Sequence, residues 1–105
     1  MSVHFMTSSP DALLREFNRR IVQEEAWGKA EGWMLKGDTS YQHSEDVSDI
    51  GAMLVPSVDA GTLTFELHAD GGKGIPPDVV KLYYTRLVET FLRWMDVRFD
   101  EVRLN

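Results

Sequence analysis

The sequence predicts one α+β domain over residues 1–105: an antiparallel sheet of three to five strands with two long helices packed on one face. Three observations carry this prediction. Apolar side chains repeat at helical spacing near each end of the chain, and residues 62–68 alternate apolar and polar side chains. A length of 105 residues suits one core rather than two. The expected order is α-β-β-β-α or α-β-β-β-α-β.

The first helix is expected to begin within residues 8–11 and to end near Gly28. Residues 8–11 read SSPD, which supplies a serine N-cap, a proline for the first helical position and an acid for the first turn. Glu16 and Arg20 are spaced to interact across one turn. The apolar stripe that would face the core consists of Leu13, Leu14, Phe17 and Ile21.

The middle of the chain predicts strands separated by turns and one long loop. Residues 33–35 form a short apolar run, and residues 38–49 are so polar that they predict a loop. Residues 50–55 form a second apolar run that Pro56 closes. In residues 62–68 one side chain in two is apolar, which is typical of an antiparallel strand with one wet face.

The second helix follows a glycine- and proline-rich connection at residues 70–77. Its apolar arc covers more than half of the circumference, so we expect it to contact both the sheet and the first helix. Residues 3–5 and 99–104 are expected to add short strands. The centre of the arc is Val80, Tyr84, Leu87, Phe91 and Met95, with Val79, Tyr83, Val88, Leu92 and Trp94 beside it.

The composition excludes several classes of protein. The chain has no cysteine, which removes disulfides, thiol nucleophiles and thiolate metal sites. It has neither an apolar run of about 20 residues for a membrane span nor a basic, apolar N-terminus typical of a secretory signal. We therefore expect a soluble cytoplasmic protein that uses no cofactor.

No motif predicts catalysis. His43 and Glu45 have the histidine–glutamate spacing of zinc deaminases, but the cysteines of that site are missing, so no metal is expected. Residues 70–74 read DGGKG, which matches neither a P-loop nor a dinucleotide fingerprint. The three histidines are scattered, and no serine–histidine–acid arrangement is recognisable. The sequence therefore predicts a protein that is not an enzyme.

The charge is concentrated in one segment. The net charge is −6, and residues 24–49 hold seven acids against two lysines, a local balance of −5. Such a segment repels nucleic acid and anionic lipid and attracts basic partners. It is either a solvated loop or a docking surface for a basic protein.

Four stretches together resemble small bacterial immunity proteins of contact-dependent growth inhibition and related polymorphic toxin systems. They are residues 5–17 (FMTSSPDALLREF), 61–65 (GTLTF), 83–87 (YYTRL) and 91–99 (FLRWMDVRF). The resemblance implies a cytoplasmic protein that binds one cognate toxin domain and blocks it. No binding motif is among the matching positions, so the resemblance assigns no contact residue.

We expect an immunity protein that masks the active site of a basic, nuclease-type toxin with an acidic surface. The carboxylates would pair with lysine or arginine of the toxin, and Tyr41 would act as an amphipathic anchor. No direct contact with nucleic acid or membrane is expected. The candidate contact residues are Asp38, Tyr41, Glu45, Asp46 and Asp49, and then Glu66, His68 and Asp70.

The alternative function is an acidic secretion chaperone or adaptor that acts as a homodimer. The wide apolar arc of residues 79–95 would then serve partly as a dimer interface. The leading hypothesis instead expects a monomer or a weak dimer.

Overall fold

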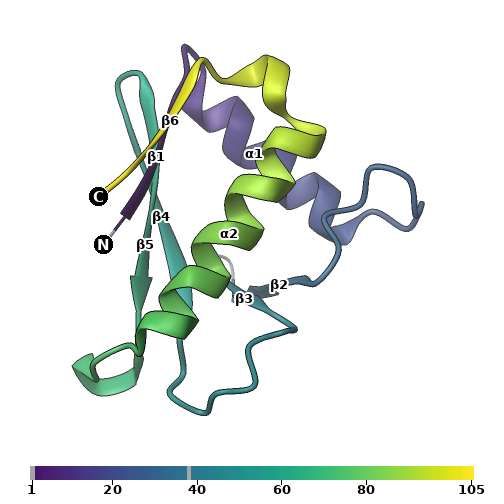
Figure 1. Ribbon diagram of the computed structural model, residues 1–105. Coiled ribbons are helices and arrows are strands. Elements are labelled where there is room, and N and C mark those ends of the chain that lie inside the picture. The colour runs from purple at the N-terminus through teal and green to yellow at the C-terminus, as the bar shows by residue number, and fades with distance from the viewer. Residues whose placement is uncertain (1, 38) are drawn as a thin grey trace.

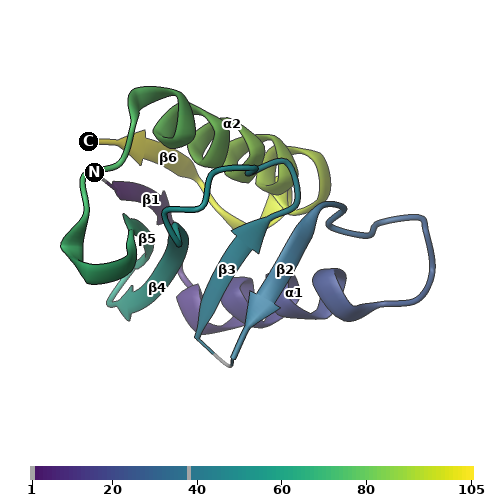
Figure 2. The same ribbon diagram turned by 90° about the horizontal axis from the view of Figure 1, so that it is seen from below.

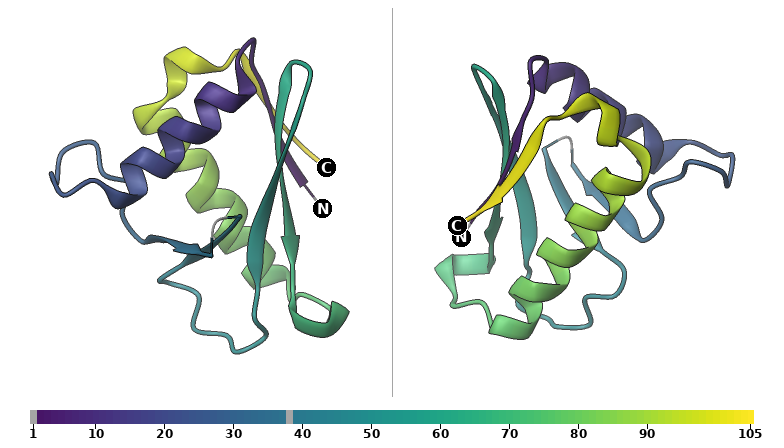
Figure 3. Two further views of the ribbon diagram at one scale, coloured as in Figure 1. Left: turned by 180° about the vertical axis from the view of Figure 1, so that it is seen from behind. Right: turned by 45° about the horizontal axis from the view of Figure 1, so that its top comes forward.

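The computed structural model describes residues 2–37 and 39–105, which form a six-stranded antiparallel sheet with two helices on one face (Figures 1 and 3). The strand order is β2-β3-β4-β5-β1-β6. The elements in chain order are β1 (Ser2–Met6), α1 (Pro10–Val22), β2 (Trp33–Lys36), β3 (Ser40–His43), β4 (Met53–Asp59), β5 (Thr62–His68), the 3-10 turn η1 (Asp70–Gly72), α2 (Pro77–Trp94), the 3-10 turn η2 (Asp96–Arg98) and β6 (Glu101–Leu104).

The α+β class and the antiparallel sheet are confirmed, but the sheet has six strands rather than three to five. The two terminal strands expected near residues 3–5 and 99–104 are present as β1 and β6. β1 lies between β5 and β6, so the ends of the chain meet at one side of the sheet (Figure 1). The amide of Ser2 donates to the carbonyl of Asn105 at 2.9 Å, and the reverse bond measures 3.0 Å.

The remaining strand is β3, within the segment expected to be a loop. Its residues pair with β2 in the register Trp33↔His43 and Leu35↔Tyr41. Tyr41 and His43 are buried on the helix side of the sheet. The prediction of a loop over residues 38–49 is therefore wrong for residues 40–43. Of these four residues, only Tyr41 counts as apolar in the sequence pattern. Because the second inward-facing residue is the polar His43, residues 40–43 show no alternation of apolar and polar side chains.

β4 also differs from expectation, because it continues through Pro56 to Asp59. Pro56 pairs with Phe65 of β5. On its other side β4 pairs with β3 only at Tyr41↔Leu54, so that side is open at Pro56. A proline without an amide donor is tolerated where a strand has such an edge.

The first helix begins as expected, with Pro10 in the first turn after Ser9, but it ends at Val22 and not near Gly28. The chain turns back there because several contacts replace the next helical turn. The amide of Ala30 donates to the carbonyl of Arg20 at 2.9 Å, and Lys29 Nζ donates to the carbonyls of Ile21 and Gln23 at 3.1 and 2.6 Å. These bonds satisfy carbonyls that a helix end leaves free.

The second helix packs against both the sheet and α1, as expected. Phe91 stacks on Phe5 of β1, with ring centroids 4.1 Å apart, and lies 5.0 Å from Phe17 of α1. Leu87, Phe91 and Met95 are buried as expected. In the first half of the helix the buried row is shifted by one residue, to Val79 and Tyr83 in place of Val80 and Tyr84, and Leu92 is 52% exposed. The buried residues of this helix and its end are Val79, Tyr83, Leu87, Phe91 and Met95.

Candidate functional site

Two surface regions lie at opposite ends of α2. We call the first the acidic end, and it consists of Glu45, Asp46, Asp49, Asp70 and Asp78. These residues come from the loop between β3 and β4, from η1 and from the first turn of α2, which meet at one end of the molecule (Figures 1 and 2). The chain therefore gathers five carboxylates from three separate segments.

Two of these carboxylates are held by α2. The Glu45 carboxylate forms an ion pair with Arg86, and that hydrogen bond lowers the pKa of Glu45. Asp46 accepts a hydrogen bond from the hydroxyl of Tyr83 at 2.9 Å and another from the amide of Ser48 at 3.0 Å. Glu45 and Asp46 therefore fix the position of the loop against α2 and also give it negative charge.

The other three carboxylates are exposed. Asp49, Asp70 and Asp78 form no ion pair within 4.0 Å in the part of the chain that the structure describes. Asp70 is tied to the loop because its amide donates to the carbonyl of Ile50 at 3.1 Å. Val47, in the same loop as Asp49, has 95% of its surface exposed. It lines a hollow of about 210 Å³ with Glu45, Asp46, Ser48, Asp78, Val79 and Leu82.

One of the predicted contact residues lies elsewhere in the structure. Tyr41 is 1% exposed, and its hydroxyl donates to Asn18 of α1 inside the molecule. The prediction that Tyr41 anchors a partner is corrected, because this side chain presents almost no surface. Burial raises the pKa of Tyr41 to about 12. Asp38 lies outside the described residues.

Two of the remaining candidate contact residues, Glu66 and His68, lie on the side of the sheet that carries no helix. Glu66 and His68 are exposed on β5, with His68 Nε2 4.0 Å from Glu66 Oε1. His68 pairs in register with Met53, the first residue of β4. These two side chains therefore lie beside the end of the loop between β3 and β4, residues 44–52, which we call the acidic loop. Asp70 belongs to the acidic end itself.

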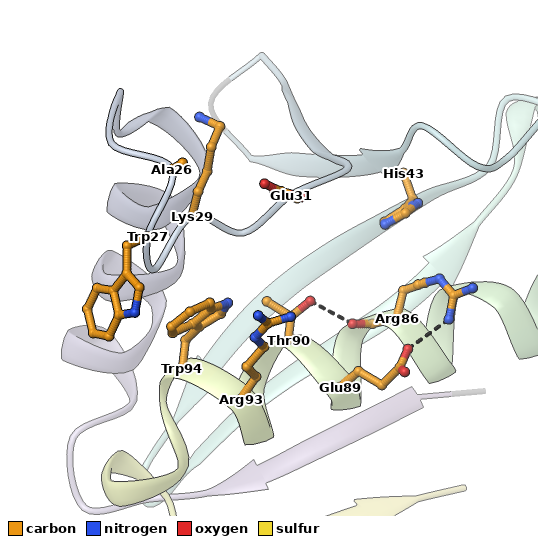
Figure 4. Close-up of a pocket in the computed structure, with 10 residues that line it drawn as sticks. All are labelled: Ala26, Trp27, Lys29, Glu31, His43, Arg86, Glu89, Thr90, Arg93 and Trp94. Carbon is orange, nitrogen blue, oxygen red and sulfur yellow. Dashed lines mark hydrogen bonds and ion pairs between the residues drawn. The ribbon is translucent and has the colours of Figure 1, made fainter.

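The second region is a cleft of about 540 Å³ beside the C-terminal half of α2, which we call the aromatic cleft (Figure 4). Trp27 and Trp94 stand at one end of it, and His43 and Arg86 stand at the other (Figure 4). Its volume is typical of a ligand site. Its lining consists of Ala26, Trp27, Lys29, Glu31, His43, Arg86, Glu89, Thr90, Arg93 and Trp94.

The tryptophan pair is flanked by cations. The two indole rings meet edge to face with centroids 5.2 Å apart. The guanidinium carbon of Arg93 lies 4.7 Å from the centroid of Trp94, and that of Arg20 lies 5.7 Å away. Both distances fall within the range of cation–π attraction. Trp27 nevertheless keeps 80% of its surface exposed.

The far end of the cleft contains a buried histidine. His43 is 5% exposed, its ring meets Trp33 edge to face at 4.8 Å, and its Nδ1 accepts the amide of Glu45 at 3.1 Å. Burial lowers the pKa of His43, and Arg86 acts in the same direction while Glu45 opposes it. Among the described residues no side-chain hydroxyl forms a hydrogen bond with this ring.

Neither region has the donors of a metal centre. Within residues 2–37 and 39–105, no three histidine or carboxylate side chains are grouped closely enough to hold an ion. The arrangement can instead bind by charge at one end and by aromatic and guanidinium contacts at the other.

The sequence analysis missed the aromatic cleft. Its lining combines residues 26–31, one residue of β3 and one face of α2, which no sequence spacing relates. One signal was available, because Trp27 is the only large apolar residue in the charged stretch from 23 to 31. A tryptophan among acids and a lysine leaves a large apolar surface in water, which a binding partner can cover.

No protein-family model, curated protein or solved structure shows a significant match to this chain. In the described part of the chain, neither helix combines the length and apolar character that crossing a membrane requires.

Proposed function

We propose that this protein binds and neutralises a basic bacterial toxin domain, of the nuclease type, by covering its active site with the acidic end. The observation that carries the proposal is that three exposed aspartates, Asp49, Asp70 and Asp78, form no ion pair among the described residues, and that exposed Val47 lines a hollow with one of them, Asp78. A nuclease needs a basic surface to hold phosphates, and such a surface attracts these carboxylates. Val47 would supply the apolar contact at the centre.

The way the acidic loop is held supports a binding role. Arg86 and Tyr83 hold Glu45 and Asp46, and the carbonyl of Ile50 holds the backbone of Asp70. A surface that is ordered before binding loses less conformational entropy on association. The family resemblance in residues 5–17 and 83–99 adds the expectation that the partner is a toxin.

The test is a charge reversal at the three unpaired positions, D49K, D70K and D78K together. Glu45 and Asp46 stay unchanged, because their reversal would also disturb α2. The partner is sought as a large open reading frame next to this chain's gene with a toxin-like C-terminal domain, and that domain is used in the assay. We expect the association rate at low salt to fall at least about tenfold, because attraction between opposite charges accelerates encounter.

The matched control reverses three exposed acids at the opposite end of the sheet, D59K, D96K and D100K, which changes the net charge equally. We expect the control to bind at nearly the natural rate and to protect cells that express the toxin. Equal association and equal protection by both triple variants would refute the acidic end as the interface. No protection by the natural chain would refute the proposed function itself.

No observation favours the homodimeric adaptor. The apolar arc of α2 that suggested it is occupied within one chain, where Phe91 and Leu87 are fully buried. Leu92 is the large apolar side chain of α2 that remains exposed.

A further inference from the structure

We propose that the aromatic cleft is a second protein-binding site, which receives a partner segment carrying an acidic side chain next to an aromatic one. This site has the opposite chemistry to the acidic end, and it does not depend on the proposed function. Arg93 would bind the carboxylate, and Trp27 would contact the aromatic side chain.

The guanidinium of Arg93 is available to bind a carboxylate. Its guanidinium rests against the face of Trp94 at 4.7 Å, and no carboxylate of the described residues lies within 4.0 Å of it. Its neighbour Arg86, in contrast, is occupied by Glu45 and by Glu89, the latter at 2.7 Å. An arginine stacked on an aromatic ring keeps its N–H edges available for a carboxylate.

The second step is the exposure of Trp27. A tryptophan with 80% of its surface in water adds little to the stability of the fold, whereas tryptophan and arginine are the residues most enriched where binding energy concentrates. Trp27 stands beside Trp94 at the mouth of the cleft (Figure 4). An incoming aromatic ring would bury the Trp27 face that water now covers.

The third step is the rigidity of the segment that carries Trp27. Gln23 Nε2 donates to the carbonyls of Glu25 and Trp27 at 2.9 and 2.8 Å. Arg20 donates to the carbonyl of Gly28 at 2.9 Å, and Lys29 Nζ is bound to the end of α1. An ordered turn therefore holds Trp27 in place, so the segment loses little conformational entropy when a ligand binds.

Charge sets the preference for an acidic ligand. Of the three cations that line the cleft, Arg86 is shared by Glu45 and Glu89 and the Lys29 ammonium is bound to backbone carbonyls, so Arg93 is the cation available to a ligand. Glu31 is the remaining acid, and it forms no ion pair within 4.0 Å among the described residues. A carboxylate at Arg93 would be attracted by that guanidinium and weakly repelled by Glu31. Removing the charge of Glu31 should then strengthen binding.

The two sites adjoin where Glu45 contacts Arg86 and His43, but the groups proposed to bind ligand lie at their far ends. The 18 residues of α2 span about 27 Å, with the acidic end at its first turn and Trp94 at its last. A standard interface covers about 800 Å² per partner, so each end can hold its own partner.

The experiment titrates the full chain with a blocked peptide, acetyl-Gly-Phe-Glu-Phe-Gly-amide, and with its Glu-to-Gln counterpart. Nuclear magnetic resonance follows the indole N–H signals of Trp27 and Trp94 and the Nε–H signal of Arg93. We expect these signals to shift, and the Glu peptide to bind about tenfold more tightly than the Gln peptide, since one charge-assisted hydrogen bond accounts for that factor.

The variants make the test specific. R93Q should abolish the preference for the Glu peptide, W27A should weaken both peptides, and E31Q should strengthen the Glu peptide. R15Q, an exposed arginine of α1 away from the cleft, should change nothing. Circular dichroism checks that every variant is folded. Equal affinity for the two peptides, shifts that avoid Trp27 and Trp94, or no shift at millimolar peptide would overturn the proposal.

Discussion

Tyr83 joins the core to the acidic end through one hydroxyl group. Its ring is fully buried, and its hydroxyl donates to Asp46 at 2.9 Å and accepts the amide of His43 at 3.3 Å. Burial raises the pKa of Tyr83. The sequence placed this tyrosine in the helix, but its partners are 37 and 40 residues away along the chain.

Gly32 provides a residue-scale prediction. Its φ is +85°, and a Cβ there would lie 2.6 Å from Cε1 and Nε2 of His43. G32A should destabilise the fold by about 2–4 kcal/mol, because backbone strain adds to a clash with a buried ring. Urea denaturation measures this loss.

The matched control is G37A. Gly37 has φ +64° but no atom within 4 Å of its would-be Cβ, so only the strain remains, about 1 kcal/mol. An equal loss of stability in the two variants would contradict the packing of Gly32 against His43.

His43 predicts a pH dependence of stability. Its folded pKa lies below the unfolded value of 6.5 because burial disfavours the imidazolium. The unfolded chain therefore binds the proton more readily. The contribution of His43 to stability is complete above pH 6.5 and declines as the pH falls below that value.

The measurement compares urea midpoints at pH 7.5 and pH 5.5 for the natural chain and for H43N, which keeps an acceptor for the Glu45 amide. The charged groups around the ring are Glu45, Asp46, Arg86 and Glu89, and they are the same in both proteins. H43N should lose less stability on acidification. A loss as large as that of the natural chain would show that His43 does not carry the effect.

At the scale of elements, the predictions that rest on a strong local pattern of side chains are confirmed. Of the four residues predicted to face the core from α1, Leu13, Phe17 and Ile21 are buried and Leu14 is partly buried against the core. The Glu16–Arg20 ion pair forms at 2.9 Å. The alternation of residues 62–68 is confirmed as β5. β3 was missed because one of its two inward-facing residues is a buried histidine rather than an apolar residue, and the end of α1 because a lysine side chain caps it.

Lys29 is the basis of an element-scale prediction. K29M removes two hydrogen bonds to the last carbonyls of α1 and a cation from its negative end, so it should cost about 1 kcal/mol. Hydrogen exchange should also accelerate in residues 24–31. K81M, on the exposed face of α2, is the control, and it should stay within about 0.5 kcal/mol of the natural chain. Equal exchange in the two variants would show that the cap does not hold the loop.

At the scale of the whole molecule, the helices cover one face of the sheet and the other face is open (Figure 3). The molecule measures 34 × 31 × 22 Å with a Cα radius of gyration of 13.1 Å. A chain of this length is expected to have about that radius as a compact monomer. The shape brings the two candidate sites to opposite ends of α2.

Sedimentation equilibrium tests the oligomeric state. We expect a monomer of 12.0 kDa, because the apolar arc of α2 is occupied within the chain. Raising the salt concentration should leave the mass unchanged. A tight dimer at micromolar concentration would contradict this expectation and favour the homodimeric adaptor.

The sequence by itself determined the α+β class, the start of α1, the hairpin strand β5 and the concentration of acids, because each depends on local periodicity or local composition. Only the tertiary structure decided that Tyr41 is buried, that Glu45 and Asp46 are held by α2, and that Trp27 meets Trp94. These are contacts between residues 23 to 67 positions apart. Local pattern carries no information on such pairs, because chain folding and side-chain packing bring them together.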